Sequence, residues 1–185
     1  MSTELKAIET VYKGNRYRSR LEARWAVFYE TLGIPYEYEP QGYNLGEAGL
    51  YLPDFWLPEH KCFVEIKGTW PDSKELAIIE ALAVQSGKPV FLFVGQIEEF
   101  HIQYEESKNG LLLRFSNDAD LFTSNGFKYS QYYWTKCELC GKYDISYCGV
   151  VGYCQDDHRI GAYENSVKIA YLKAKQARFE HGERG

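Results

Sequence analysis

Residues 51–68 of the chain read YLPDFWLPEHKCFVEIKG. Two segments rich in aromatic and β-branched residues, 51–57 and 62–67, flank a connection that is short enough to predict an antiparallel hairpin. Because side chains alternate along a strand, Glu65 and Lys67 are expected on the same face. Pairing across the turn then brings Asp54 close to Glu65. The sequence therefore predicts that two acids and a lysine share one site on this hairpin.

A helix is predicted before the hairpin, over residues 19–32, because apolar residues recur there at helical spacing and the pattern stops at Gly33. Glu22 lies about a quarter-turn from the centre of the apolar face of this helix, so its carboxylate can reach over the edge of the sheet. Residues 34–38 can form a strand, and the glycine-rich residues 41–49 are typical of a loop.

A second helix is predicted after the hairpin, with Ser73 as its N-cap and Gly87 as its end. The apolar run 90–94 then predicts a buried central strand, parallel to the strand that carries Glu65. Segments 100–104 and 111–115 predict a further hairpin at the edge of the sheet, and residues 162–179 predict a closing helix.

Composition excludes several classes of protein. The 185 residues are 45% hydrophobic and 16% aromatic, enough for one substantial core and a small appendage. No apolar run approaches the roughly 20 residues that span a bilayer, and the first residues lack the features of a signal peptide. We therefore expect a cytoplasmic protein without a membrane partner, in the cytoplasm of the host cell if the protein is phage-encoded.

The three predicted acids Glu22, Asp54 and Glu65 would repel one another unless a cation lay between them. Ligands that are all oxygen suit Mg²⁺ or Mn²⁺. Such an ion could activate water for attack on a phosphate, with Lys67 orienting the water or stabilising the transition state. Each residue also has a structural explanation: Ser19 and Glu22 match a capping box, Asp54 follows a proline as in turns, and Glu65 and Lys67 could be an exposed pair.

In this order, Glu22, then Pro53-Asp54, then Glu65-Ile66-Lys67, the chain resembles the PD-(D/E)xK nuclease superfamily over roughly residues 15–95. Small phage-encoded nuclease-like proteins of this superfamily are similar over nearly the whole chain, in residues 17–25, 51–55 and 177–183. The resemblance implies an α/β restriction-endonuclease-like core with the order αβββαβ, metal ligation by the three acids, and catalysis by Lys67. The Gln-x-x-x-Tyr motif of the exonuclease-like branch does not follow the second helix, which disfavours processive end-resection.

Five cysteines, two of them the closely spaced Cys137 and Cys140, favour a zinc site over a disulfide framework. Cys154 and His158 would complete a tetrahedral set with a structural role. An all-thiolate alternative uses Cys148 in place of His158, but Cys148 falls at the bend of an expected hairpin. The other alternative is that these are ordinary buried cysteines.

Other residues with metal-binding side chains receive no role. Cys62 is expected in the core or at the edge of a strand. His60, which lies in the predicted turn, is expected to face solvent, as are His101 and His181. The predicted metal chemistry therefore rests on the acids and on the cysteine cluster.

The net charge of −5 means that any contact with nucleic acid has to rely on a local basic patch. Such a patch is predicted near the start of the chain, although charge runs are also common as solvated faces. Its members are Lys13, Arg16, Arg18, Arg20 and Arg24.

These patterns together predict a Mg²⁺-dependent endonuclease that acts on DNA, with RNA remaining open as an alternative substrate. The alternative is a non-catalytic module that binds nucleic acid or protein with the same fold and zinc cluster. We expect a nuclease core over residues 1–128, a zinc-ribbon-like module over 129–160, and a closing helix and tail over 161–185. The sequence leaves the oligomeric state open, and a homodimer is one option.

Overall fold

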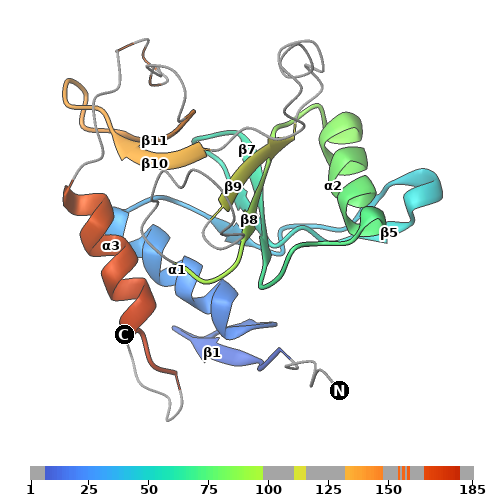
Figure 1. Ribbon diagram of the computed structural model, residues 1–185, viewed down its shortest axis with the longest axis horizontal. Helices are drawn as coiled ribbons and strands as arrows, with labels where there is room; N and C mark the ends of the chain where they lie inside the picture. The colour runs from blue at the N-terminus through green and yellow to red at the C-terminus, as the bar shows by residue number, and fades with distance from the viewer. Residues whose placement is uncertain are drawn as a thin grey trace.

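The computed structural model describes residues 7–97, 111–115, 132–147, 154, 156, 158 and 165–179. These residues form a mixed α/β fold with three α-helices and a mixed five-stranded sheet (Figure 1). The helices are α1 (Arg20–Leu32), α2 (Ser73–Ser86) and α3 (Asn165–Gln176), with a short 3-10 helix η1 (Gly46–Ala48). The strands are β1 (Thr10–Tyr12), β2 (Asn15–Tyr17), β3 (Glu37–Tyr38), β4 (Tyr43–Asn44), β5 (Leu50–Tyr51), β6 (Phe55–Leu57), β7 (Cys62–Lys67), β8 (Val90–Val94), β9 (Leu111–Phe115), β10 (Tyr132–Lys136) and β11 (Tyr143–Tyr147).

The central sheet has the strand order β3-β6-β7-β8-β9. The predicted hairpin is confirmed: β6 and β7 are antiparallel, with Trp56 opposite Phe63. The predicted parallel strand is also confirmed, because α2 carries the chain back across the sheet and β8 runs beside β7, with Glu65 opposite Leu92. β9 pairs antiparallel with β8 at the edge of the sheet. The hairpin strand that carries Glu65 therefore lies at the centre of the sheet.

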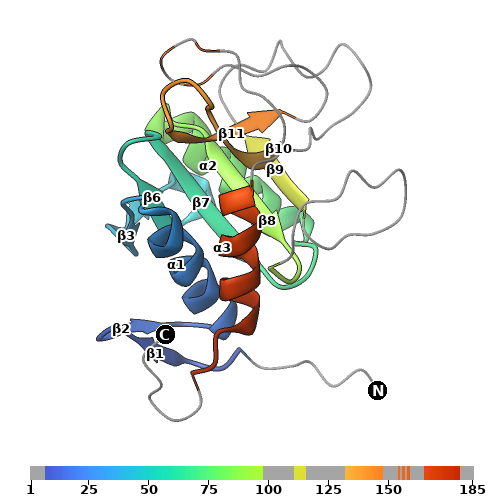
Figure 2. The ribbon, with the colours of Figure 1, turned by 90° about the vertical axis from the view of Figure 1, so that its left-hand side faces the viewer.

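Helices cover both faces of the sheet, as Figure 2 shows with α1 and α3 on one side and α2 behind. The face toward α1 and α3 buries Phe55, Val64 and Ile66 in a large aromatic core. The opposite face buries Phe63 and Leu92 against α2. Because strands alternate, Glu65 belongs to the face on which Phe63 lies. The strand that carries Glu65 therefore presents this acid on the side of α2.

The first helix follows its sequence signals closely. Ser19 is the N-cap and accepts a hydrogen bond from the Glu22 backbone N–H, as the capping pattern predicts. Gly33 ends the helix with φ of 69°, a left-handed conformation that favours glycine. The buried face of α1 includes Trp25 and Phe28, which pack against Tyr171 of α3. The helix is thus fixed at both ends and along its apolar face.

Several predicted boundaries were wrong. Residues 51–57 do not form one strand, because β5 pairs with β4 in a separate hairpin while β6 joins the central sheet. Pro53, which has no N–H to donate to a ladder, lies in the break between them. Asp72 rather than Ser73 caps α2, since its carboxylate accepts hydrogen bonds from two N–H groups of the first turn. The expected loop 41–49 contains β4 and η1.

The later part of the chain packs into the same core as α1. Trp134 of β10 and Val167 and Tyr171 of α3 belong to the aromatic cluster that also holds Trp25. This core therefore takes residues from each of the three predicted parts of the chain. The predicted segment 100–104 lies outside the described residues. Among the described helices, none has the length and apolar character that a membrane crossing needs.

Candidate functional site

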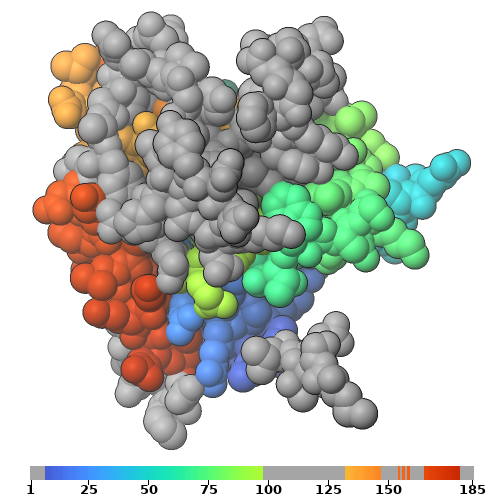
Figure 3. All heavy atoms as spheres, in the orientation of Figure 1, coloured from blue at the N-terminus to red at the C-terminus, as the bar shows by residue number. Residues whose placement is uncertain are grey.

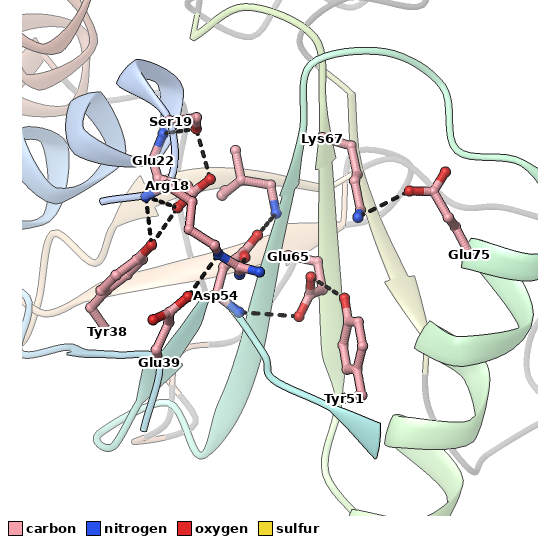
Figure 4. A network of polar contacts seen from close by, with 11 residues as sticks. Arg18, Ser19, Glu22, Tyr38, Glu39, Tyr51, Asp54, Glu65, Lys67 and Glu75 are labelled. Atoms are coloured by element: carbon pink, nitrogen blue, oxygen red, sulfur yellow. Dashed lines mark hydrogen bonds and ion pairs between the residues drawn. The ribbon is translucent and has the colours of Figure 1, made fainter. Parts of the chain in front are cut away.

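Three buried acids extend from the start of α1 to the central strand of the sheet. Glu22 of α1, Asp54 just before β6, and Glu65 of β7 are 6%, 5% and 1% exposed, although acids are rarely buried without partners. Figure 4 shows Asp54 between the residues of α1 and Glu65. The structure thus brings the predicted acids into one network, and each of them has a defined set of partners.

Backbone hydrogen bonds tie Asp54 and Glu65 together. The Asp54 N–H donates to Oε1 of Glu65 at 3.2 Å, and the N–H of Ile66 donates to Oδ2 of Asp54 at 2.7 Å. The Asp54 N–H is available to Glu65 because Asp54 lies in the break between β5 and β6, while the Asp54 carbonyl accepts a hydrogen bond from the Glu39 N–H at 2.9 Å. The two carboxylates are therefore held side by side at the end of the β6–β7 hairpin.

Neither of these two acids ionises as readily as it would in water. Burial and then the charge of Glu22 raise the pKa of Asp54 to about 7. Burial and then the charge of Asp54 raise the pKa of Glu65 well above its ordinary value. A cation at this position would favour the charged form of both groups, and the predicted metal ligation by these acids stays a prediction.

Glu22 is held by donors on three sides. The Tyr38 hydroxyl donates to Oε2 at 2.6 Å, the Ser19 hydroxyl donates to Oε1 at 2.7 Å, and the Arg18 N–H donates to Oε2 at 3.2 Å. The capping interpretation and the site interpretation of Glu22 are therefore compatible. One carboxylate fixes the start of α1 and also points toward Asp54.

Arg18 supplies the positive charge in this network. Its guanidinium lies 2.5 Å from Oδ1 of Asp54 and 2.7 Å from Oε1 of Glu39. Burial lowers the pKa of Arg18, but Asp54, Tyr38, Glu22 and Glu39 together raise it above its ordinary value. Arg18 was predicted as part of a DNA-binding patch. In the structure it pairs with Asp54, a predicted metal ligand, and its role in DNA binding stays a prediction.

Tyr51 is a further member of the site that the sequence did not reveal. Its hydroxyl donates to Oε2 of Glu65 at 2.5 Å, and burial followed by the charge of Glu65 raises the Tyr51 pKa above its ordinary value. This contact exists because β5 turns away from the sheet. The spacing in the sequence gives no signal of it, since residues 51 and 65 would not be expected to meet in a regular hairpin.

Lys67 shares the sheet face of Glu65, as alternation predicted, and its Nζ lies 3.2 Å from Oε1 of Glu75 on α2. The Lys67 side chain is 28% exposed. Lys67 is the last residue of β7, and Figure 4 shows its side chain next to α2. Against the larger effects of burial and of Asp54, the charge of Lys67 is near enough to lower the pKa of Glu65.

The second predicted cluster is compact. Ligand atoms of Cys137, Cys140, Cys154 and His158 all lie within 4.8 Å of one another, the one such group of at least three among the described residues. By the same distance criterion, the carboxylate oxygens of the three buried acids do not form such a group. The cysteine cluster could therefore bind a metal such as zinc, whereas the acids form a looser arrangement.

The spacing of the cluster suits tetrahedral zinc. Zn–S bonds of about 2.3 Å place two ligands of a tetrahedron roughly 3.8 Å apart. The Sγ atoms of Cys140 and Cys154 are 3.7 Å apart, and Sγ of Cys137 is 3.7 Å from Nδ1 of His158. The predicted choice of His158 is thus compatible with the geometry, and Cys148 lies outside the described residues.

A tight turn between β10 and β11 positions the first cysteine pair. The Gly141 N–H donates to the Cys137 carbonyl at 2.8 Å, and Gly141 has φ of 73°. Backbone N–H groups of Cys140 and Leu139 lower the pKa of Cys137 to about 6. A lowered pKa favours the thiolate, which is the form that binds metal.

His60 connects this cluster to the central sheet, so the prediction that it faces solvent was wrong. Its Nε2 lies 2.9 Å from the Tyr143 carbonyl of β11, and its ring packs edge-on against Trp134 at a centroid distance of 5.2 Å. Cys62, at the start of β7, is buried as expected. The turn of the β6–β7 hairpin thus contacts β10 and β11, the strands on either side of the turn that holds Cys137 and Cys140.

The predicted basic patch is divided in the structure. Lys13 pairs with Glu30, and Arg16 pairs with Glu9. Arg24 keeps a different environment, because its pKa is lowered by burial and then by the nearby charges of Arg20 and Arg178. We call Arg20, Arg24 and Arg178 the arginine cluster. It lies on α1 and on the segment after α3.

No protein-family model, curated protein or solved structure matches the chain. Its function therefore has to be inferred from the positions and chemistry of its own residues.

Proposed function

We propose that the chain is a metal-dependent endonuclease of the PD-(D/E)xK type that hydrolyses DNA phosphodiester bonds. The observation that carries the proposal is the side-by-side burial of Asp54 and Glu65 on a hairpin at the centre of a mixed sheet, with Lys67 on the face of Glu65. Burial that raises the pKa of both acids is common at functional sites and supports the proposal beside this geometry.

The donor set suits Mg²⁺ or Mn²⁺ because Asp54, Glu65 and Glu22 offer only hard oxygens. Asp54 and Glu65 would hold the ion, with Glu22 as the third acid. When bound, the ion would lower the pKa of a water and neutralise charge on the phosphate. The ion pair between Arg18 and Asp54 supports this assignment, because positive charge is favourable beside Asp54.

The chain's own residues have distinct tasks in this proposal. Lys67 orients the attacking water or stabilises charge that develops on the phosphate oxygens. Tyr51 holds the Glu65 carboxylate in one orientation, and Tyr38 does the same for Glu22. These hydrogen bonds reduce the movement of the acids, so that the geometry is established before the substrate arrives.

We assign zinc to the cluster of Cys137, Cys140, Cys154 and His158, with a structural role. Four protein ligands leave no open position for water, so this ion would not take part in hydrolysis. The contact of His60 with β11 favours a role in supporting the β6–β7 hairpin, which carries Asp54 and Glu65.

One observation favours a second candidate, a nucleic-acid-binding protein without catalysis. Arg18 neutralises Asp54, and Glu75 neutralises Lys67. If these pairs persist when nucleic acid binds, neither Asp54 nor Lys67 is available for the roles proposed above. The two candidates differ in whether magnesium changes the DNA.

A nicking assay on supercoiled plasmid decides between them. We expect cleavage when magnesium is added, and no cleavage by Asp54→Asn or Glu65→Gln. Glu80→Gln, which changes an exposed acid on α2, is the matched control and should cleave like the unchanged protein. The same assay on RNA tests the substrate class. Absence of magnesium-dependent cleavage of either nucleic acid by the unchanged protein, or full activity of Asp54→Asn, would refute the proposal.

A further inference from the structure

A recess lies on the same sheet face as Glu65, apart from the acids described above. It has a volume of about 390 Å³, within the range of small-ligand sites. Its aromatic members are Trp56 of β6, Phe63 of β7 and Tyr43 of β4. We call this recess the aromatic cleft. Its remaining lining residues are polar or turn residues: Glu37, Pro40, Gln41, Ser86 and Lys88.

The rings of the aromatic cleft are arranged around a fixed base. Phe63 is 2% exposed, and both other rings pack on it, Trp56 at a centroid distance of 4.7 Å and Tyr43 at 5.4 Å. Trp56 and Tyr43 are only half-buried. The cleft therefore presents aromatic surface that is held in place from below and remains accessible from outside.

The aromatic cleft adjoins the proposed active site. Phe63 and Glu65 are two positions apart on β7, so they share a face and are separated by roughly 7 Å along the strand. The same spacing relates Asp54 and Trp56 in the neighbouring segment, and Trp56 lies directly opposite Phe63. Cleft and acids thus follow one another along the same pair of strands.

The β4–β5 hairpin contacts both the aromatic cleft and Glu65. Tyr43 of β4 is the register partner of Tyr51 of β5. Tyr43 contacts Phe63 in the cleft, while Tyr51 donates a hydrogen bond to Glu65. Figure 3 shows this hairpin projecting beside α2. A molecule bound in the cleft would therefore lie against the element that also positions Glu65.

The charges at the cleft suit a nucleotide. Lys88 is exposed and forms no ion pair with any residue that the structure describes, so it can meet a phosphate. Glu37 and Gln41 offer oxygens that accept hydrogen bonds from the amino and ring N–H groups of bases. Aromatic rings stack on every base, which makes them common in sites for single-stranded nucleic acid.

We propose that the aromatic cleft binds one unpaired nucleobase of the DNA strand, next to the phosphate that a cation at Asp54 and Glu65 would contact. This inference rests on the proposed nuclease function and extends it to a substrate class: DNA that carries unpaired bases near the cleaved bond. A paired base is stacked within its duplex and cannot enter a recess of this kind without being extruded.

Binding is best measured without added magnesium, by fluorescence anisotropy with a labelled single-stranded oligonucleotide and with the same sequence as a blunt duplex. Trp56→Leu keeps an apolar side chain but removes the ring, whereas Trp56→Phe keeps a ring. We expect Trp56→Leu to weaken single-strand binding about 5- to 100-fold, and Trp56→Phe to restore most of it. Leu50→Ala, in the same hairpin as Tyr43 but 85% exposed and outside the cleft, should bind normally.

The proposal is overturned if Trp56→Leu binds the single strand as tightly as the unchanged protein, or loses single-strand and duplex binding equally. It is also overturned if the unchanged protein does not bind the single strand. That result is expected if the cleft binds a peptide and not a nucleobase. A thermal melt of each variant identifies loss of folding. Since no magnesium is present, these results are independent of the nicking assay, so a failure of the cleft and a failure of the catalytic site are distinguishable.

Discussion

At the scale of single residues, the site combines groups whose ordinary behaviour is altered by their surroundings. Burial raises the pKa of Asp54 and the pKa of Glu65, and the partly exposed Arg18 forms an ion pair with Asp54. Because each group depends on its neighbours, a substitution at one position should change how the others behave.

The first prediction concerns stability and pH. The pKa of Asp54 is about 7 in the folded chain against an ordinary value of 3.8, so the folded state holds a proton that the unfolded state has released. The free energy of unfolding should therefore fall as pH rises between these values. Asp54→Asn removes this contribution. We expect a melting temperature a few degrees higher than that of the unchanged protein at about pH 8, and a shallower dependence on pH.

Thermal melts from about pH 4 to 8 measure this effect, with Glu80→Gln as the control that should follow the unchanged protein. A profile for Asp54→Asn as steep as that of the unchanged protein would show that Asp54 ionises normally in the folded chain.

The second prediction concerns Lys67. Lys67→Ala should reduce magnesium-dependent cleavage more than about 100-fold, because the variant has no charge at this position to act on the transition state. Its stability should change by less than about 1 kcal/mol, since the Lys67–Glu75 pair is partly exposed to solvent. Glu75→Ala is the matched control. It breaks the same ion pair but leaves the lysine in place, so it should still cleave. Equal activity of Lys67→Ala and the unchanged protein would remove Lys67 from the mechanism.

At the scale of elements, the β10–β11 hairpin and the β6–β7 hairpin support each other. Cys137 and Cys140 lie at the turn after β10, and His60 links the other turn to β11. A metal that tightens the first turn should therefore also stabilise the packing of the second.

The third prediction follows from that packing. Cys140→Ser should lose the roughly one zinc per chain expected of a four-ligand site, and should melt several degrees lower, because metal binding contributes to folding. Asp54→Asn should retain the zinc while losing cleavage. Elemental analysis of both purified variants measures this. Zinc retained in Cys140→Ser, or lost from Asp54→Asn, would contradict the assignment of two separate sites.

The sequence predicted most of the elements because their signals are local. The apolar spacing of α1, the four-residue turn before Cys62 and the apolar run of β8 each depend on residues close together in the chain. Alternation along β7 likewise placed Glu65 and Lys67 on one face. These parts of the candidate site were accessible from the sequence alone.

The remaining parts depend on contacts between distant residues. Tyr51 reaches Glu65 only because β5 leaves the sheet, and His60 is held in place only because β11 packs beside it. The pairing of Arg18 with Asp54 joins residues of two different elements. A charge run near the start of the chain gives no information about which of its members meets a buried acid.

At the scale of the whole molecule, the net charge of −5 opposes general attraction to nucleic acid, so the position of the remaining cations matters. Lys13 and Arg16 pair with acids, and the pKa of Arg24 is lowered by burial and then by the nearby charges of Arg20 and Arg178. An anion beside Arg24 would favour its charged form. We therefore propose Arg24 and Arg178 of the arginine cluster as residues that bind phosphate.

The fourth prediction tests that choice. Replacing Arg24 and Arg178 with glutamine should weaken DNA binding similarly for all sequences, and should reduce the salt dependence by about one unit of slope for each phosphate that the variant no longer neutralises. Lys173→Gln, an exposed lysine of α3, is the control and should have little effect. Anisotropy titrations at several salt concentrations give the slopes. An unchanged slope in the double variant would assign these arginines to solvation.

The packing of α3 against α1 has a consequence for the synthesis of the protein. Trp25 and Phe28 of α1 are covered by Tyr171, a residue that the ribosome adds long after both of them. Until α3 emerges, a nascent chain exposes this aromatic surface and offers it to chaperones. The acids on the central hairpin are made early but rest on a core that closes late. The folded core is therefore expected only after translation has passed α3, so unfinished chains should lack the nuclease activity proposed above.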